Sequence, residues 1–223
     1  MIAPVAKIKK KDLIWLSLHK CKHRHSFLEH YECFLKEMPR QEERIGFLDI
    51  EASQLNADFG FILCYAIKER KGPIILRVAT PKEIRSGEPD KRILKQFVTD
   101  ARTFDRLVVY YGTDHRFDIP FLRTRALYYG LNFPSLREIK VTDVYPMVRN
   151  KLRLHRNRLE SAIKFFGIPG KEHELLPGVW MRATVGDKKA IDWIAKHNIE
   201  DVESLEKLFE LLVPFVNVID ASI

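Results

Sequence analysis

The sequence predicts an α/β fold in which helices flank a mixed five-stranded sheet, preceded by a small N-terminal extension. Three observations support this fold class. Short apolar segments separated by turn residues come first, strand-like and helix-like segments then alternate, and the last third has helical periodicity. The chain of 223 residues exceeds the usual domain of about 150 residues, so one full domain with an extension fits its length.

The predicted sheet begins with three strands, at residues 45–52, 59–68 and 74–79. Each segment is apolar and is bounded by polar residues, glycine or proline, as strands usually are. The connections at residues 53–58 and 71–73 are short enough for hairpins. We therefore expect these three strands to be antiparallel.

Helices and strands alternate after a predicted loop at residues 81–89. Residues 90–104 and 119–129 place apolar side chains at the three- and four-residue spacing of a helix. Residues 107–111 form a short apolar segment typical of a buried strand, and residues 138–144 are a further strand candidate. The predicted order of elements is βββαβαβ.

The last third of the chain is predicted to be helical. Residues 158–166 form one helix, and residues 187–213 carry one apolar stripe that allows a break near His197. The start of the chain differs, because it holds half of the histidines and two of the three cysteines. We therefore divide the chain into an N-terminal extension, residues 1–43, and a main domain, residues 44–223.

The net charge of +8 is concentrated in two segments. Residues 1–40, with nine basic and four acidic residues, contribute +5, and residues 149–158, with five basic residues, contribute another +5. Clustered basic residues attract polyanions, and nucleic acid is the commonest polyanion for such a protein. A solvated helix face is the alternative. The candidate contacts to a nucleic-acid strand are Arg153, Arg156 and Arg158.

Composition excludes or disfavours several classes of protein. The longest apolar segment, residues 59–67, has nine residues, whereas crossing a bilayer takes about 18. The first residues lack the apolar stretch of a secretory signal. Three cysteines, an odd number, favour a reducing compartment. We expect a cytoplasmic protein that does not insert into a membrane.

Acidic residues occur at two places where sites are common. Strand alternation puts Asp49 and Glu51 on one face, where the two carboxylates repel each other and lose solvation. A divalent cation usually compensates such a pair, and a solvated strand end is the alternative. Asp118 follows a predicted buried strand and precedes a helix, which is a place for sites in α/β sheets and also for helix caps.

His197 and Asp201 are four residues apart in the last predicted helix, so they share one face if the helix is continuous. Histidine is suited to proton transfer at neutral pH. A lone histidine is nevertheless more often a surface residue or a satisfied core residue. Spacing alone leaves both interpretations open.

Four stretches carry a resemblance to a known family. They are FLDIEASQL at residues 47–55, FDIPFLRTRAL at 117–127, LESAIKFFGIPGK at 159–171 and HNIEDVESLEKLF at 197–209. Over residues 44–215 the chain resembles the DEDD 3′-to-5′ exonucleases of the ribonuclease H-like superfamily, and among them the YprB-like exonucleases. The resemblance implies a ribonuclease H-like fold in a prokaryotic or virus-encoded protein that degrades DNA or RNA from single-stranded 3′ ends.

The resemblance also implies roles for individual residues. Four acids would hold two Mg²⁺ or Mn²⁺ ions in a two-metal mechanism, and the cations would neutralise their charge. These acids are Asp49, Glu51, Asp118 and Asp201. His197 stands where relatives carry the tyrosine or histidine that handles the attacking water, and many relatives with this spacing carry tyrosine.

Several further interpretations accompany the resemblance. Leu55 matches the apolar residue that packs on the terminal base in the family, although it also suits the core of a turn. We expect Tyr111 and Phe117 to be core residues rather than stacking platforms. Two other functions stay open, a structure-selective endonuclease on the same fold and a catalytically silent nucleic-acid-binding module. The sequence does not indicate whether a polymerase or helicase is a partner.

The N-terminal extension contains a group of soft metal ligands. Two cysteines and two histidines can supply one structural Zn²⁺ with sulfur and nitrogen, namely Cys21, His25, His30 and Cys33. His23 is a rival to His25. The spacing fits no standard zinc finger, and the alternative is a helix whose polar face is rich in histidine.

Overall fold

The computed structural model describes residues 10–33, 43–113, 116–135, 138–170 and 176–216. The chain falls into two compact units, Met1–Glu42 and Glu43–Ile223. Residues 1–9 and 34–42 of the predicted N-terminal extension lie outside the described residues. Within the first unit, helix α1 (Lys10–Leu18) precedes a segment rich in turns.

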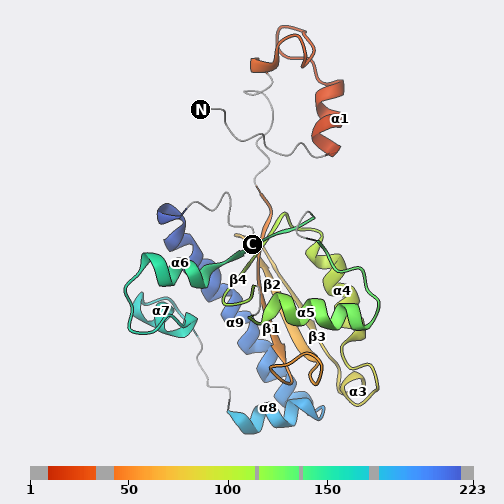
Figure 1. Cartoon of the computed structure of the whole chain (residues 1–223), viewed down its shortest axis with the longest axis vertical. Coiled ribbons are helices and arrows are strands. Elements are labelled where there is room, and N and C mark those ends of the chain that lie inside the picture. The colour runs from red at the N-terminus through yellow and green to blue at the C-terminus, as the bar shows by residue number, and fades with distance from the viewer. Residues whose placement is uncertain (1–9, 34–42, 114–115, 136–137, 171–175, 217–223) are drawn as a thin grey trace. The chain divides into compact units, whose positions relative to one another are not determined.

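The second unit is built on a five-stranded sheet in the order β3-β2-β1-β4-β5 (Figure 1). The strands are β1 (Ile45–Ala52), β2 (Ile62–Glu69), β3 (Ile74–Val78), β4 (Arg106–Val109) and β5 (Lys140–Asp143). Strand β1 pairs antiparallel with β2 and parallel with β4, while β3 is antiparallel to β2 and β5 is parallel to β4. The structure confirms the predicted mixed sheet and its antiparallel start.

Helices predicted from periodicity are present as α4 (Lys91–Ala101), α5 (Asp118–Tyr128), α7 (Leu159–Phe165) and α9 (Lys188–Leu212). Helix α9 is continuous, so the break allowed near His197 does not occur. Asp187 caps the start of α9, because its side chain accepts a hydrogen bond from the Ala190 amide at 3.1 Å. Within the described part of the chain, no helix combines the length and apolar character needed to cross a bilayer.

Three further helices occur where the sequence predicted a loop or no element. They are α3 (Pro81–Ile84), α6 (Val144–Lys151) and α8 (Pro177–Thr184). Helix α3 begins with a capping box, in which Thr80 and Glu83 exchange hydrogen bonds. Helix α6 is capped by Asp143, which accepts a hydrogen bond from the Tyr145 amide at 2.9 Å. Helix α8 buries only Ala183, so its periodicity carries little signal.

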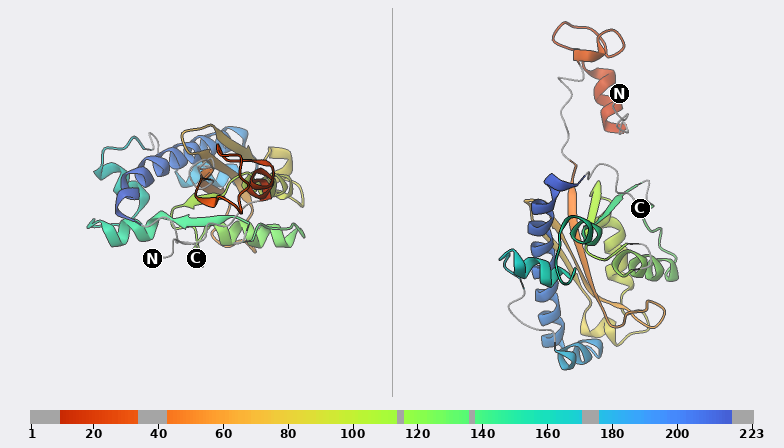
Figure 2. Two further views of the ribbon diagram at one scale, coloured as in Figure 1. Left: turned by 90° about the horizontal axis from the view of Figure 1, so that it is seen from above. Right: turned by 60° about the vertical axis from the view of Figure 1, so that its left-hand side comes forward.

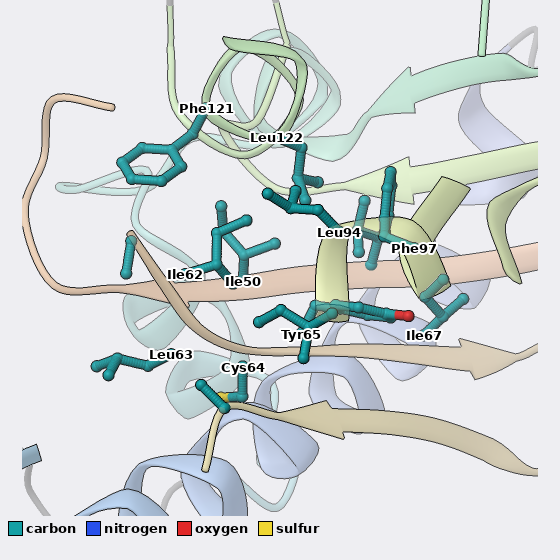
Figure 3. Packing of buried hydrophobic residues seen from close by; sticks show 14 of the residues in the cluster. Ile50, Ile62, Leu63, Cys64, Tyr65, Ile67, Leu94, Phe97, Phe121 and Leu122 are labelled. Atoms are coloured by element: carbon teal, nitrogen blue, oxygen red, sulfur yellow. The ribbon is translucent and has the colours of Figure 1, made fainter. Parts of the chain in front are cut away.

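Strand β1 divides its side chains between the two faces of the sheet. Phe47 packs in a core with the second half of α9, whereas Leu48 and Ile50 pack in a larger core with α4 and α5. Figure 2 shows α9 along one face of the sheet and α4 and α5 on the other. Figure 3 shows part of the larger core, including Phe97 and Phe121. Because side chains alternate along a strand, the odd-numbered residues after Phe47 also face α9.

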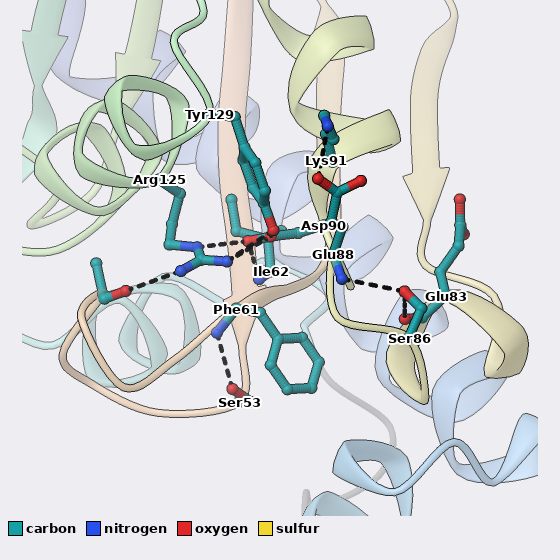
Figure 4. Close-up of polar contacts among 11 residues, drawn as sticks. Ser53, Phe61, Ile62, Glu83, Ser86, Glu88, Asp90, Lys91, Arg125 and Tyr129 are labelled. Atoms are coloured by element: carbon teal, nitrogen blue, oxygen red, sulfur yellow. Dashed lines mark hydrogen bonds and ion pairs between the residues drawn. The ribbon is translucent and has the colours of Figure 1, made fainter.

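Polar contacts tie the loop between β1 and β2 to α4 and α5 (Figure 4). Arg125 of α5 donates hydrogen bonds of 2.9 and 2.7 Å to the two carboxylate oxygens of Asp90, and both side chains are buried. Arg125 also donates to the Ala57 carbonyl at 3.4 Å. Within the loop, the Phe61 amide donates to the Ser53 hydroxyl at 3.0 Å. The buried ion pair therefore braces the loop that follows the acidic strand.

Candidate metal centre

Asp49 and Glu51 lie on the face of β1 that packs against α9, and both are partly buried. The side chain of Asn198 on α9 donates a hydrogen bond from Nδ2 to Oδ2 of Asp49 at 2.6 Å. This bond joins the acidic strand to the last helix. The sequence pattern does not indicate this role for Asn198, beyond its place next to His197.

His197 and Asp201 lie one helical turn apart on α9, as the four-residue spacing predicts. His197 Nε2 lies 3.7 Å from Oδ2 of Asp201, and both side chains are buried. Glu51, His197 and Asp201 each offer a ligand atom, and these atoms lie within 4.8 Å of one another. The structure therefore brings three of the predicted residues together, one from β1 and two from α9.

Asp118 reaches β1 on the side where β4 pairs with it. The paired residues of β1 and β4 stop at Phe47 and Val108, which leaves the later amides of β1 available to side chains. Asp118 Oδ1 accepts a hydrogen bond from the Ile50 amide at 3.2 Å. The cap position of α5 is Phe117, so Asp118 is the first helical residue and the capping interpretation is wrong.

The Asp118 carboxylate is buried in a place shaped by a glycine. A Cβ at Gly112 would clash with Oδ2 of Asp118, so this close approach requires glycine. Burial raises the pKa of the Asp118 carboxyl to about 7, and the negative charges of Asp143 and Asp201 add to the shift, although backbone amides donate to the carboxylate. A buried acid that resists ionisation marks this place as a candidate site.

Asp143, at the end of β5, is a further buried acid that the sequence analysis does not identify. It accepts hydrogen bonds from the Tyr111 and Gly112 amides at 2.9 and 3.2 Å and from Nη1 of Arg116 at 2.6 Å. These donors show that Asp143 holds the loop before α5. Its position at the carboxyl end of a parallel strand is the signal that could have identified it, since the same signal identifies Asp118.

A groove of about 770 Å³ opens beside this loop. Its lining consists of three tyrosines, Tyr110, Tyr111 and Tyr145, and of residues 155–159. The Tyr110 hydroxyl donates a hydrogen bond to the Asn157 carbonyl at 2.6 Å. This bond holds the irregular segment between α6 and α7 against the end of β4.

Two of the groove tyrosines also contact a cationic side chain. The guanidinium carbon of Arg116 lies 4.9 Å from the ring centres of both Tyr111 and Tyr145. Tyr111 is 49% exposed and has a φ of 59°, so the expectation that it is a core residue is wrong. Phe117, in contrast, packs against the larger core as expected. The sequence contains no signal that would separate these two aromatic residues.

The basic segment at residues 149–158 does not form one helix face. Its first three residues end α6, and the remainder is irregular up to the start of α7. Arg153, Arg156 and Arg158 are all exposed, and Arg156 and Arg158 line the groove. The segment is therefore not one helix face, although its arginines are exposed to solvent.

Leu55 lies in the loop between β1 and β2 and is 82% exposed. It does not contribute to the core of a turn, which excludes that interpretation. Phe59, in the same loop, is equally exposed. The loop after the acidic strand thus presents two apolar side chains to solvent.

The predicted cysteine and histidine ligands lie in the first compact unit. The residues whose ligand atoms lie within 4.8 Å of one another are Cys21, His23, His30 and Cys33. His23, the rival ligand, therefore belongs to this group. Nδ1 of His25 lies 3.4 Å from Nδ1 of His30.

The residues of the second unit fit divalent cations. Carboxylate oxygens are the ligands that Mg²⁺ and Mn²⁺ favour, and Glu51 and Asp201 bring theirs within 4.8 Å of each other. Burial, together with the charges of Asp143 and Asp201, raises the pKa of Asp118, and a bound cation would offset the cost of ionising it. Asp49, held by Asn198, lies on the same face of β1 as Glu51. The donor atoms and their charge both suit hard cations.

Comparisons with known proteins agree with the fold. Residues 46–213 match the family model of the RNase H superfamily. The family B DNA polymerase from the hyperthermophilic archaeon Pyrobaculum calidifontis has a similar structure, with a TM-score of 0.64 and 22% identity over 78% of this chain and 25% of the polymerase. The chain thus spans about a quarter of the polymerase's length.

A solved structure described as the apo form of a nuclease gives a TM-score of 0.46 and 14% identity, over 80% of this chain and 77% of that chain. No curated protein matches the chain in sequence.

Proposed function

The chain belongs to the RNase H superfamily, and from this premise we propose that it is a metal-dependent 3′-to-5′ exonuclease acting on DNA or RNA. One observation carries the proposal. Acidic side chains from β1, the start of α5 and the middle of α9 converge at one end of the sheet, although they are far apart in sequence. Such a group has no structural purpose that apolar residues would not serve better.

The cofactors of this proposal are two Mg²⁺ or Mn²⁺ ions. The residues that would hold them are Asp49, Glu51, Asp118 and Asp201. When bound, the cations would supply positive charge that activates water and stabilises the leaving 3′ oxygen of the phosphodiester. Four carboxylates balance the charge of two divalent cations, which supports two ions rather than one.

The chain's own residues would accept the proton of the attacking water and position the metal ligands. In this proposal His197 takes the proton of the attacking water, because it lies beside Glu51 and Asp201 in the same group. Asp201 Oδ2, 3.7 Å from His197 Nε2, favours the protonated ring that results. Asn198 keeps the Asp49 carboxylate turned toward α9 through its 2.6 Å hydrogen bond.

The groove supplies a path for a single strand. Exposed Tyr111 offers a ring for base stacking, and Arg156 and Arg158 offer charge for phosphates along the same lining. Leu55, exposed in the loop after β1, would pack on the terminal base. These features support a substrate with an accessible single-stranded 3′ end, since stacked duplex bases would not reach the rings.

Digestion of end-labelled oligonucleotides tests this function. With 5′-labelled single-stranded DNA and RNA of one sequence, a 3′-to-5′ exonuclease gives a ladder that shortens from full length and releases mononucleotides. The activity should need Mg²⁺ or Mn²⁺, stop with chelator, and be lost in Asp49→Asn. The Asp49→Asn protein, purified in the same way, controls for a contaminating nuclease.

Circular single-stranded DNA separates the three candidate functions. An exonuclease leaves the circle intact, whereas an endonuclease linearises it. A silent binding module retains both circular and linear strands without cutting either. Cleavage of the circle at the rate of the linear strand would overturn the exonuclease proposal and favour the endonuclease.

A further inference from the structure

Within residues 14–33, whose side chains the structure describes, the first compact unit has a small apolar core. The buried apolar residues of this stretch are Leu16, Cys21 and Cys33, with Trp15 and Phe27 packed against them. Units of about 40 residues usually need a disulfide, a metal or a partner to stay folded. The three cysteines of the chain form no disulfide. A metal is therefore the cross-link that the residues of this unit can supply.

Four side chains of this unit already have the spacing of a metal site. Nδ1 of His23 lies 3.2 Å from Nδ1 of His30, 3.3 Å from Sγ of Cys33 and 4.0 Å from Sγ of Cys21. Sγ of Cys21 lies 3.7 Å from Nδ1 of His30. Zinc distances of about 2.0 Å to nitrogen and 2.3 Å to sulfur give edges of about 3.3–3.8 Å in a tetrahedron. The four measured edges cluster around this range.

Backbone hydrogen bonds form one turn beside Cys21 and His23 and another beside His30 and Cys33. In the first half the Arg24 amide donates to the Cys21 carbonyl at 2.7 Å, and the Cys21 amide donates to the His25 carbonyl at 3.1 Å. Arg24 has a φ of 66°, which closes a tight turn. In the second half the Cys33 amide donates to the His30 carbonyl at 3.2 Å. Each turn thus presents one cysteine and one histidine toward the same point.

We propose that Cys21, His23, His30 and Cys33 bind one Zn²⁺ in a closed tetrahedral site that folds the N-terminal unit. Two sulfur and two nitrogen ligands suit zinc, and four protein ligands leave no open position, as in structural rather than catalytic sites. Both thiols lose their protons on binding, so each zinc bound releases two protons from the cysteines. The buried thiols, Cys21 at 2% and Cys33 at 8% exposed, would be shielded from other reactions.

The proposal assigns His23, rather than its neighbour His25, as the nitrogen ligand of the first turn. Nδ1 of His23 contacts Sγ of both cysteines, at 4.0 and 3.3 Å. His25 instead contributes its backbone carbonyl to the turn. This assignment gives the experiment a matched pair, because the two histidines are two residues apart and both are exposed.

Elemental analysis of the full chain, purified without added metal, tests the site. We expect about one zinc per chain, and less than a tenth of that in Cys21→Ser, Cys33→Ser, His23→Ala and His30→Ala. His25→Ala and Cys64→Ser should keep the zinc. Loss of zinc in His25→Ala with retention in His23→Ala would overturn the ligand assignment.

Thiol modification of the parent protein keeps the test independent of variant folding. With zinc bound, Cys21 and Cys33 should resist alkylation, and a chelator strong enough to remove zinc should expose both, as mass spectrometry of peptides would show. Zinc-free protein in which both thiols are equally protected, or joined in a disulfide, would overturn the proposal. The result does not depend on the proposed nuclease function, because nuclease activity is not part of either readout.

Discussion

The side-chain amide of Asn198 donates a hydrogen bond of 2.6 Å to the carboxylate of Asp49, across 149 positions of sequence. Asn198 is fully buried and belongs to α9, so it orients the carboxylate from outside the acidic strand. Hydrogen bonds to ionised groups are stronger than those between neutral groups. Asn198 is therefore a positioning residue for the proposed metal centre.

Asn198→Ala should raise the Mg²⁺ concentration that gives half-maximal nuclease activity by about 10- to 100-fold, the usual effect of losing a partner that orients a metal ligand. Activity at saturating Mg²⁺ should recover, because Asp49 itself is kept. Lys189→Gln, at an exposed position of the same helix, is the control. An unchanged Mg²⁺ requirement in a folded Asn198→Ala protein would show that the hydrogen bond does not position Asp49 for metal.

Asp118→Asn should stabilise the chelator-treated protein at pH 8 and have little effect at pH 4. The folded pKa, about 7, lies above the ordinary value of 3.8, mainly because the carboxyl is buried. Below about pH 3 both states bind the proton, and near pH 4 the unfolded state is only about half ionised, so the penalty is still small. As pH rises to 7 the unfolded state ionises first, so the free energy of unfolding falls, and above pH 7 the full penalty applies. Asparagine removes this penalty.

Thermal unfolding across pH 4–8 measures this effect. A penalty of a few kcal/mol corresponds to a rise in Tm of roughly 5 °C or more for Asp118→Asn at pH 8. Asp58→Asn, at an exposed position in the loop after β1, is the control. With added Mg²⁺ the parent should have the higher Tm of the two proteins, because the cation stabilises the parent and not the variant. A difference in Tm that does not change with pH would contradict the burial of an ionisable Asp118.

The paired substitutions Arg156→Gln and Arg158→Gln should weaken binding to a single-stranded oligonucleotide and reduce its salt dependence. Each arginine that neutralises a phosphate adds about 0.7 to the slope of log affinity against log salt, so its removal lowers the slope by that amount. Both arginines line the groove, whereas Arg149 and Lys151 end α6 in the same segment. The pair Arg149→Gln and Lys151→Gln is therefore a control with the same change in charge.

Fluorescence anisotropy over a range of salt concentrations measures the slope, in an Asp49→Asn background that prevents cleavage. We expect the slope to decrease more in the groove pair than in the control pair. Equal decreases would show that the segment acts through its net charge and that the groove is not the path of the strand.

Long elements could be predicted because burial imposes a regular pattern on them. Helix α9 keeps one buried stripe through 25 residues, and the strands β1 and β2 are apolar along most of their length. Helix α3 has only four residues and α8 buries only Ala183, so little periodic signal exists in either. Helix α6 does bury Val144, Met147 and Val148 at helical spacing. This apolar pattern is short, however, because basic residues follow it in the last turn of the helix.

Site residues could be predicted where both members of a pair belong to the same strand or helix, because the regular spacing of that element places them together. Strand alternation pairs Asp49 with Glu51, and one helical turn pairs His197 with Asp201. The partner of Asp49 could not be predicted in this way, because Asn198 reaches it only once α9 packs on the sheet.

The same limit applies to the loop before α5. The position of Asp143 at the end of a strand could have marked it as a site residue, but its hydrogen-bond donors come from a loop around 30 positions earlier and no local pattern predicts them. The choice between His23 and His25 depends on the direction in which the turn at Arg24 points each ring.

His197 has two possible roles in the proposed site, and a metal titration separates them. A ligand atom of its ring lies within 4.8 Å of those of Glu51 and Asp201, so the ring can accept a proton beside the cations or bind one itself. Mg²⁺ favours oxygen ligands, whereas imidazole suits softer transition metals. We therefore expect proton transfer to be the role of His197 when Mg²⁺ is the cofactor.

His197→Ala should then lower turnover by about 10²- to 10⁴-fold at every Mg²⁺ concentration, the usual contribution of a positioned base, with the half-saturating concentration unchanged. His197→Tyr should restore part of the rate, because the resemblance to the DEDD exonucleases implies that tyrosine can serve at this position. Single-turnover digestion at increasing Mg²⁺ and Mn²⁺ measures both quantities. Turnover that returns to the parental value at high Mn²⁺ would identify His197 as a metal ligand, because excess metal overcomes the absence of one ligand and does not replace a missing base.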